Sequence, residues 1–208
     1  MYKRNRKKSI WLSLLLFLIV GLALLAQQTI VFFRTPDETR INNQLEQWLR
    51  QEFGSHATAE TAQIFKTVHV ESENPKWEYG IFCAFQYDGS LGCAVFQRES
   101  GFLDALKLRE ARISCYQSCG TDNIQAVGGI SICGEPYRAF LSQEPRLHEI
   151  VWGLGDRLPN EHYTIRACPD AVLISGPERK FKLLAQDGIV LYETEPWPDP
   201  LLAGESYS

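Results

Sequence analysis

The chain has 208 residues, of which 45% are hydrophobic and 22% are charged, and its formal net charge is −4. The near balance hides an uneven distribution, because residues 35–208 hold fifteen Lys or Arg against twenty-five Asp or Glu, a net charge of −10. Such an acidic segment repels phosphate groups, which argues against nucleic acid and against anionic lipid headgroups as partners.

The N-terminal region predicts a membrane anchor. Residues 10–33 carry no charged side chain and are long enough to cross a hydrocarbon layer of about 30 Å. Residues 1–9 form a basic tail, which places the N-terminus in the cytoplasm and everything after Arg34 outside. A cleaved signal peptide is the alternative, but its apolar core is typically only about 7–15 residues long. We therefore expect an uncleaved signal-anchor, a single-pass protein in the cell membrane, and contact with the lipid bilayer through residues 10–33.

An amphipathic helix is predicted directly after the membrane, over residues 35–54. Thr35, Pro36 and Glu38 match a capping box with proline at the first helical position, and Gly54 suits the end of the helix. Apolar residues at helical spacing then form one stripe: Ile41, Leu45, Trp48, Leu49 and Phe53. We expect this stripe to pack on the helix's own domain, with a juxtamembrane dimerisation helix as the alternative.

Residues 55–194 predict a β-rich extracytoplasmic domain, because short β-prone runs of period two are separated by turn residues. The expected strands are 62–70, 78–86, 91–98, 124–132, 161–168, 170–175, 179–186 and 189–194, while 102–118 and 139–152 fit either a strand or a short helix. The predicted fold class is α+β: a transmembrane helix, a short amphipathic helix, and a mainly antiparallel β domain built as a sandwich or a curled sheet.

Residues 195–208 have the sequence Glu-Pro-Trp-Pro-Asp-Pro-Leu-Leu-Ala-Gly-Glu-Ser-Tyr-Ser. Spaced prolines and acidic residues are typical of an extended or disordered tail. We expect a solvated segment here, with binding of the segment to an aromatic groove as the alternative.

Two Asp-Gly pairs predict hairpin turns. Tyr87-Asp88-Gly89 and Gln186-Asp187-Gly188 both suit a three-residue loop with glycine in the left-handed position. In the first hairpin this loop places Cys83 opposite Cys93, and in the second it places Leu183 opposite Leu191. A two-residue Asp-Gly loop in the first hairpin is the alternative, and it would separate the two cysteines.

All six cysteines follow the anchor, which is the distribution expected of disulfide chemistry outside the cell. The three-residue loop makes Cys83 and Cys93 a candidate cross-strand disulfide, with two adjacent buried thiols as an equal alternative. Strand alternation places Cys133 opposite the face shared by four apolar residues: Ile124, Ala126, Ile130 and Ile132. Cys168 is likewise on a polar face, so Cys133 and Cys168 form a second candidate disulfide.

Cys115-Tyr-Gln-Ser-Cys119 is the candidate metal site, since two thiolates four residues apart can face one metal ion. A membrane anchor with a C-x-x-x-C motif resembles the copper-delivery proteins of the Sco type, which implies copper binding by Cys115 and Cys119. The thioredoxin-like βαβ pattern of that family is not predicted around the motif. A structural disulfide is the alternative, and no cofactor is predicted.

Thr164-Ile165-Arg166-Ala167-Cys168 resembles the T-L-x-T-C nucleophile strand of sortases, which also combine an N-terminal anchor with a β-barrel. The resemblance implies that Cys168 is the nucleophile of a cysteine transpeptidase. It covers five residues and departs at two of them. His162 is about 20 Å away along an extended chain, so a histidine base would have to come from another segment.

The sequence therefore predicts a membrane-anchored extracytoplasmic binding or regulatory module rather than an enzyme, without assigning any catalytic residue. The expected partner is a protein or an envelope component at the outer face of the membrane. The expected functional surface is the sheet face or the loops near residues 115–123. Metal or redox chemistry at Cys115 and Cys119 is the alternative function, followed by transpeptidation at Cys168.

Overall fold

The computed structural model describes residues 17–21, 37–54, 62–101, 105–113, 117–118, 123–154, 159–176 and 179–194. The chain divides into two compact units, Met1–Arg40 and Ile41–Ser208. Of the predicted anchor, residues 17–21 are described and are helical, and the rest lies outside the described residues. No helix formed by the described residues has both the length and the apolar character needed to cross a membrane.

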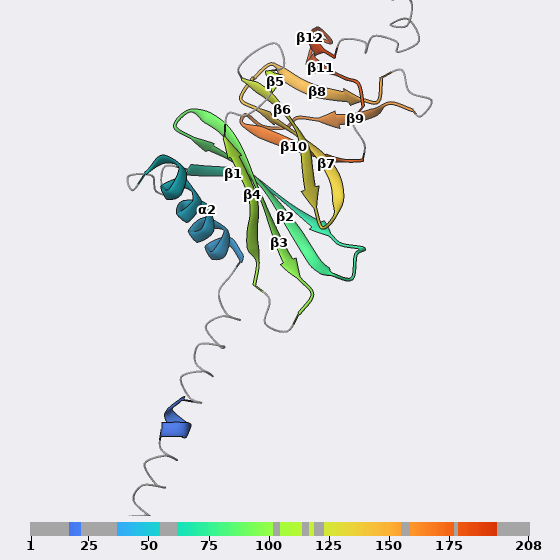
Figure 1. Cartoon of the computed structure of the whole chain (residues 1–208). Helices are drawn as coiled ribbons and strands as arrows, with labels where there is room; N and C mark the ends of the chain where they lie inside the picture. The colour runs from blue at the N-terminus through green and yellow to red at the C-terminus, as the bar shows by residue number, and fades with distance from the viewer. Residues whose placement is uncertain are drawn as a thin grey trace, which may run out of the picture. The chain divides into compact units, whose positions relative to one another are not determined.

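The described residues form one amphipathic helix and three four-stranded antiparallel sheets (Figure 1). Helix α2 is Asp37–Phe53, and the sheet orders are β1-β2-β3-β4, β10-β7-β6-β5 and β12-β11-β8-β9. The strands are β1 Ala62–Glu71, β2 Trp77–Tyr87, β3 Ser90–Glu99, β4 Lys107–Ile113, β5 Gln117–Ser118, β6 Ile124–Ile132, β7 Glu135–Ser142, β8 Leu147–Trp152, β9 Glu161–Thr164, β10 Asp170–Ser175, β11 Phe181–Ala185 and β12 Val190–Glu193. The prediction of a mainly antiparallel β fold is confirmed.

Helix α2 covers one face of the β1–β4 sheet (Figure 1). Ile41, Leu45 and Leu49, at i, i+4 and i+8, are buried against this sheet, and Trp48 packs at the edge of the same cluster. Gln44 fixes the contact further, because its side chain donates to the carbonyl of Leu106 (2.8 Å) and accepts from the N–H of Leu108 (2.6 Å). The apolar stripe on α2 therefore packs on the helix's own domain, which was the expected arrangement.

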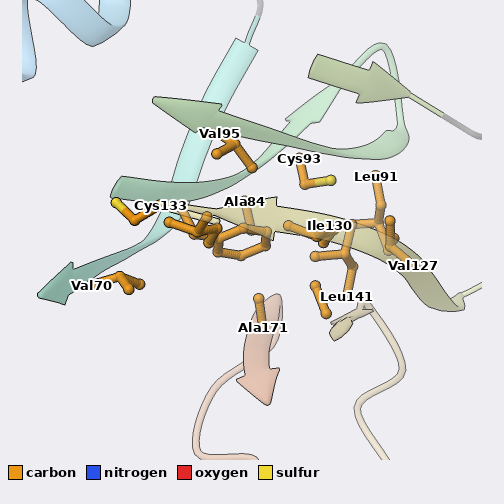
Figure 2. Close-up of a cluster of buried hydrophobic side chains, with 13 residues drawn as sticks. Val70, Ala84, Leu91, Cys93, Val95, Val127, Ile130, Cys133, Leu141 and Ala171 are labelled. Carbon is orange, nitrogen blue, oxygen red and sulfur yellow. The ribbon is translucent and has the colours of Figure 1, made fainter. Parts of the chain in front are cut away.

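Three buried clusters hold the layers together. The first lies between the helix and the β1–β4 sheet, the second between that sheet and the β10-β7-β6-β5 sheet, and the third between the latter and the β12-β11-β8-β9 sheet. Because the middle sheet is buried on both faces, neighbouring residues of β7 serve different clusters: Ala139 and Leu141 face the second, and Phe140 faces the third. Figure 2 shows the second cluster, with Cys133 at one end and Leu91 at the other.

A bulge in β6 reverses the predicted alternation of side chains. Pairing with β7 shifts between Val127 and Ile130, and Gly129 there adopts a positive φ of 68°. Ile124 and Ala126 consequently face the third cluster, while Ile130 and Ile132 face the second. The prediction that these four residues share one face is wrong, because an extra residue in a bulge exchanges the two faces of a strand.

The first hairpin has a two-residue loop, which corrects the predicted register. Tyr87 pairs with Ser90, and both loop residues have positive φ, 47° at Asp88 and 75° at Gly89. This is the geometry of a type I′ turn, whose twist matches that of the flanking strands. Cys83 therefore pairs with Ala94, and Cys93 pairs with Ala84.

The second hairpin keeps its predicted register only near the loop. The N–H of Ala185 donates to the carbonyl of Ile189 (2.8 Å), as a three-residue loop requires. A bulge then follows, and Leu183 pairs with Tyr192 in place of the predicted Leu191. The loop chemistry of Asp187-Gly188 is visible in the sequence, but the bulge beyond it is not.

Candidate functional site

An open cleft of about 800 Å³ lies at the hairpin end of β11 and β12. Three segments far apart in the sequence line it: residues 145–148 at the start of β8, residues 165–168 after β9, and residues 185–191 around the second hairpin. The lining combines the buried side chains of Leu147 and Ile165 with the exposed residues Arg146, His148 and Arg166. An apolar base with cationic groups around it suits a ligand that carries both apolar and anionic groups.

Asp170 shapes the segment that carries Arg166 and Cys168. One carboxylate oxygen accepts from the backbone N–H of Arg166 (3.1 Å), and the other accepts from the N–H of Ala171 (2.8 Å) and from the Lys66 ammonium (3.0 Å). Strand β9 was predicted to continue to residue 168, but it ends at Thr164, and the N–H of Arg166 turns to this carboxylate.

The charge on Asp170 is stabilised by these contacts. Burial by itself would raise the pKa of the carboxyl group, because the charged form loses hydration. The hydrogen bonds from Arg166, Lys66 and Ala171 outweigh burial and lower the pKa below its ordinary value. Since Lys66 lies on β1, the same carboxylate joins the cleft segment to the β1–β4 sheet.

Arg146 is held at the cleft by a buried carboxylate. Its Nε donates to Glu144 (2.8 Å), whose side chain is only 8% exposed, while 65% of the Arg146 side chain is exposed. The hydrogen bond from Arg146 is the main cause of the lowered pKa of Glu144. The guanidinium is therefore held through Nε, while most of the Arg146 side chain stays exposed at the cleft.

The second hairpin supplies the apolar side of the cleft. Ile189 is 61% exposed and lines the cleft together with Leu191. Asp187 is the one acidic residue of the lining, and its carboxylate accepts from the N–H of Ile189 (3.1 Å) within the loop. This hydrogen bond leaves the charge of the carboxylate in place, so the lining holds two arginines, Arg146 and Arg166, against one acidic residue, and Arg146 is itself paired with Glu144.

Cys168 is an exposed thiol on the same lining. Its Sγ donates to the backbone carbonyl of Gln143 (3.3 Å). The Gln143 amide in turn donates to the carbonyl of Gly89 (3.1 Å), which connects the cleft with the tip of the first hairpin. The structure thus places Cys168, His148 and Arg166 on one cleft, which the sequence alone did not bring together.

The other described cysteines are buried free thiols, and neither candidate disulfide is formed. Cys83 faces α2 and Cys93 faces the middle sheet, so the corrected register separates this pair. Cys133 precedes β7, whereas Cys168 lies beside Gln143 at the other end of that strand, so the second pair is separated too. Burial raises the pKa of the Cys83 thiol to about 12, and a hydrogen bond with Thr67 offsets only part of this effect.

The predicted metal site cannot be placed, because Cys115 and Cys119 lie outside the described residues. Between them, Gln117 and Ser118 form β5 and pair with β6. Within the described ranges, no group of three or more His, Cys, Asp or Glu side chains is arranged to hold a metal ion. The functional surface expected near residues 115–123 also lies mostly outside the described residues.

Sequence reasoning missed the cleft, although it named several of the residues that line it. Cys168 and Arg166 were singled out by the sortase-like segment, and the Asp187-Gly188 loop by its turn chemistry. Arg146 was not singled out, because it lies in the stretch 139–152, which fits either a strand or a short helix, and an arginine there looks like an ordinary surface residue. A comparison with known proteins adds no assignment: no family model, no curated protein and no solved structure matches the chain.

Proposed function

We propose that the protein is a membrane-anchored extracytoplasmic binding module whose ligand site is the cleft between residues 145–148, 165–168 and 185–191. The observation that carries the proposal is the composition of the lining, in which exposed Arg146 and Arg166 flank the apolar side chains of Leu147 and Ile165. Grooves that recognise extended chains combine an apolar base with a few charged groups that fix orientation.

The ligand in this proposal is a protein segment or an envelope component that presents an anionic group beside an apolar one. Arg146 and Arg166 bind the anionic group, and the side chains of Leu147, Ile165 and Leu191 bind the apolar group. The domain is acidic outside the cleft, so repulsion disfavours anionic ligands that approach other faces.

Photo-crosslinking in cells that produce the protein natively tests this proposal. Benzoylphenylalanine replaces either Ile189, which lines the cleft, or Val190, which is 48% exposed but is not part of the lining. We expect a light-dependent adduct with another envelope component from position 189 and not from position 190. Equal adducts from both positions, or none from either, would contradict a ligand site in the cleft.

The proposed topology places residues 10–33 in the membrane and the cleft outside the cell. A maleimide that does not cross membranes is expected to label Cys168 in intact cells, since this thiol is exposed. A Ser9→Cys variant provides the control, because residue 9 is proposed to lie in the cytoplasm and should react only after permeabilisation. The opposite pattern of labelling would reverse the topology.

A cysteine-dependent acyl transfer is the second candidate function. The observation in its favour is that the cleft lining holds a histidine, His148, and an arginine, Arg166, in addition to the exposed Cys168. This function predicts an acyl adduct on Cys168 in protein isolated from cells, detectable by mass on the tryptic peptide 167–179. The adduct should disappear in Cys168→Ala and decrease strongly in His148→Gln. Finding only the unmodified thiol would remove this candidate.

A further inference from the structure

Residues 195–208 have the chemistry that the cleft requires. They follow Thr194, and the chain contains no Lys or Arg after Lys182. The segment supplies three carboxylates, at Glu195, Asp199 and Glu205, and the adjacent leucines 201 and 202. Its negative charge complements the arginines of the cleft, and its leucines match the apolar base.

The position of Thr194 gives the segment access to the cleft. Thr194 is fixed on the third sheet, where its N–H donates to the carbonyl of Phe181 (3.0 Å). From Thr194, the lining begins at Leu191, three residues back along an extended strand, and reaches Ile189 after five, distances of about 10 Å and about 17 Å at about 3.3 Å per residue. Strand β12 is at the edge of its sheet, so the path back along it is open within the described fold.

The spacing of prolines divides the segment into a spacer and a ligand. Residues 195–200 contain a proline at every second position, and such sequences extend by about 3.1 Å per residue, or about 19 Å in total. A spacer of this length would be long enough to return the chain from Thr194 to the cleft and would allow Leu201, Leu202 and Glu205 to reach its lining. A stiff spacer whose length matches the gap maximises the effective concentration of the attached ligand.

We propose that residues 195–208 occupy the cleft of their own chain, with Leu201 and Leu202 on Leu147 and Ile165, and Glu205 against the arginines. The inference rests on the proposed function, since it makes the segment an internal competitor of the external ligand. An external ligand must displace the segment, so a higher concentration of that ligand is needed for binding. For an effective concentration of about 1 mM and a dissociation constant of about 0.1 mM, the cleft is occupied about ten times more often than it is open.

Cys168 reports occupancy of the cleft without any added label. It is exposed on the lining, and trypsin isolates it in the peptide 167–179, which contains no other cysteine. The experiment measures the rate at which iodoacetamide modifies Cys168 in the full chain and in a chain that stops after Thr194. We expect a rate about ten times higher in the shortened chain, and a return to the slow rate on adding a synthetic 195–208 peptide at millimolar concentration.

A point variant and an internal control complete the test. The full-length double variant Leu201→Ser, Leu202→Ser should react as fast as the shortened chain, and the synthetic peptide with the same changes should give no protection. Buried Cys83 must stay unmodified in every sample, which confirms that each chain is folded. Equal rates for Cys168 in the full chain and in the double variant would overturn the inference.

The outcome separates this inference from the proposed function. Equal Cys168 rates together with a position-189 adduct to another envelope component would remove the internal competitor and leave the binding module intact. A slow Cys168 rate in the full chain alone, with no adduct to any other component, would support the internal contact and contradict the external ligand.

Discussion

Adding one methyl group at Gly80 is expected to disturb the interface between the first two sheets. A Cβ built on Gly80 would lie 2.3 Å from Cγ2 of Ile132 and 3.2 Å from Sγ of Cys133. Carbon atoms in contact are ordinarily about 3.5–4.0 Å apart, so the neighbour must move by more than an ångström. Ile132 is fully buried among the side chains of the second cluster, so it cannot move out into solvent. Gly80→Ala should therefore lower the free energy of unfolding by about 1–3 kcal/mol, the usual cost of overpacking a core.

Urea unfolding and thermal unfolding measure this effect, with Gly128→Ala as the matched control. Gly128 lies in β6, has no atom within 4 Å of the added Cβ and has no positive φ that strains an alanine. A loss of about 1–3 kcal/mol corresponds to a melting temperature lower by about 2–12 °C in a domain of this size, and Gly128→Ala should change it by much less. Equal effects from the two substitutions would refute the assignment of a steric conflict at Gly80.

A double-mutant cycle identifies the atom responsible. Ile132→Ala removes Cγ2 and should cost about 2–5 kcal/mol by itself, because it leaves a cavity. The methyl group added at Gly80 partly fills this cavity. The double variant should thus be more stable than the sum of the single effects predicts, by on the order of 1 kcal/mol. Strict additivity would show that the two side chains do not meet.

Three further substitutions or labels test the remaining contacts. Asp170→Asn should lower stability at pH 7 by about 1–3 kcal/mol. The folded pKa of Asp170 lies below the unfolded value of about 4, so the carboxylate's contribution to stability is complete above about pH 4 and is lost as pH falls through the folded pKa. The difference in unfolding free energy between wild type and variant, measured by urea unfolding, should therefore narrow below about pH 4. A difference that does not depend on pH would contradict this. Arg138 is 7% exposed, and its guanidinium carbon lies 5.3 Å from the Phe181 ring centroid. Arg138→Ala should therefore lower the free energy of unfolding by about 2 kcal/mol or more. The control is Arg109→Ala, at the more exposed ring of Trp77, which should lower it by less than about 1 kcal/mol in the same assay. Native alkylation followed by peptide mapping should modify Cys168 before Cys83, Cys93 and Cys133, and rapid modification of any buried thiol would be inconsistent with the packing.

Periodicity and turn chemistry predicted the helix and most strands, because both patterns depend on residues that are close together in the sequence. The stripe on α2 and the alternation in β1 to β3 each follow from which side chains must leave water. Registers were less predictable, since they depend on single residues. Gly89 allows a loop of either two or three residues, and only the pairing of Tyr87 with Ser90 selects the shorter one.

Long-range contacts account for what the sequence did not reveal about the cleft. The end of β9 is set by Asp170, four residues after Arg166, and by Lys66 on another sheet. The position of Arg146 is set by the buried carboxylate of Glu144. In the sequence, nothing distinguishes Glu144 from the acidic residues that lie on the surface. Strand alternation likewise assigned Cys133 to a polar face, but β6 ends at Ile132, and Cys133 lies in the turn beyond it with a positive φ of 55°, where it is buried in the same cluster as Ile130.

The most direct test of the binding module combines the position-189 crosslink with a change of charge in the cleft. In the chain carrying benzoylphenylalanine in place of Ile189, Arg166→Glu should abolish the adduct with the external component, and Arg166→Lys should retain a large part of it. This result would assign the ligand to the cleft and its recognition to positive charge. An adduct that persists unchanged in Arg166→Glu would contradict the proposal that this cleft binds an anionic ligand.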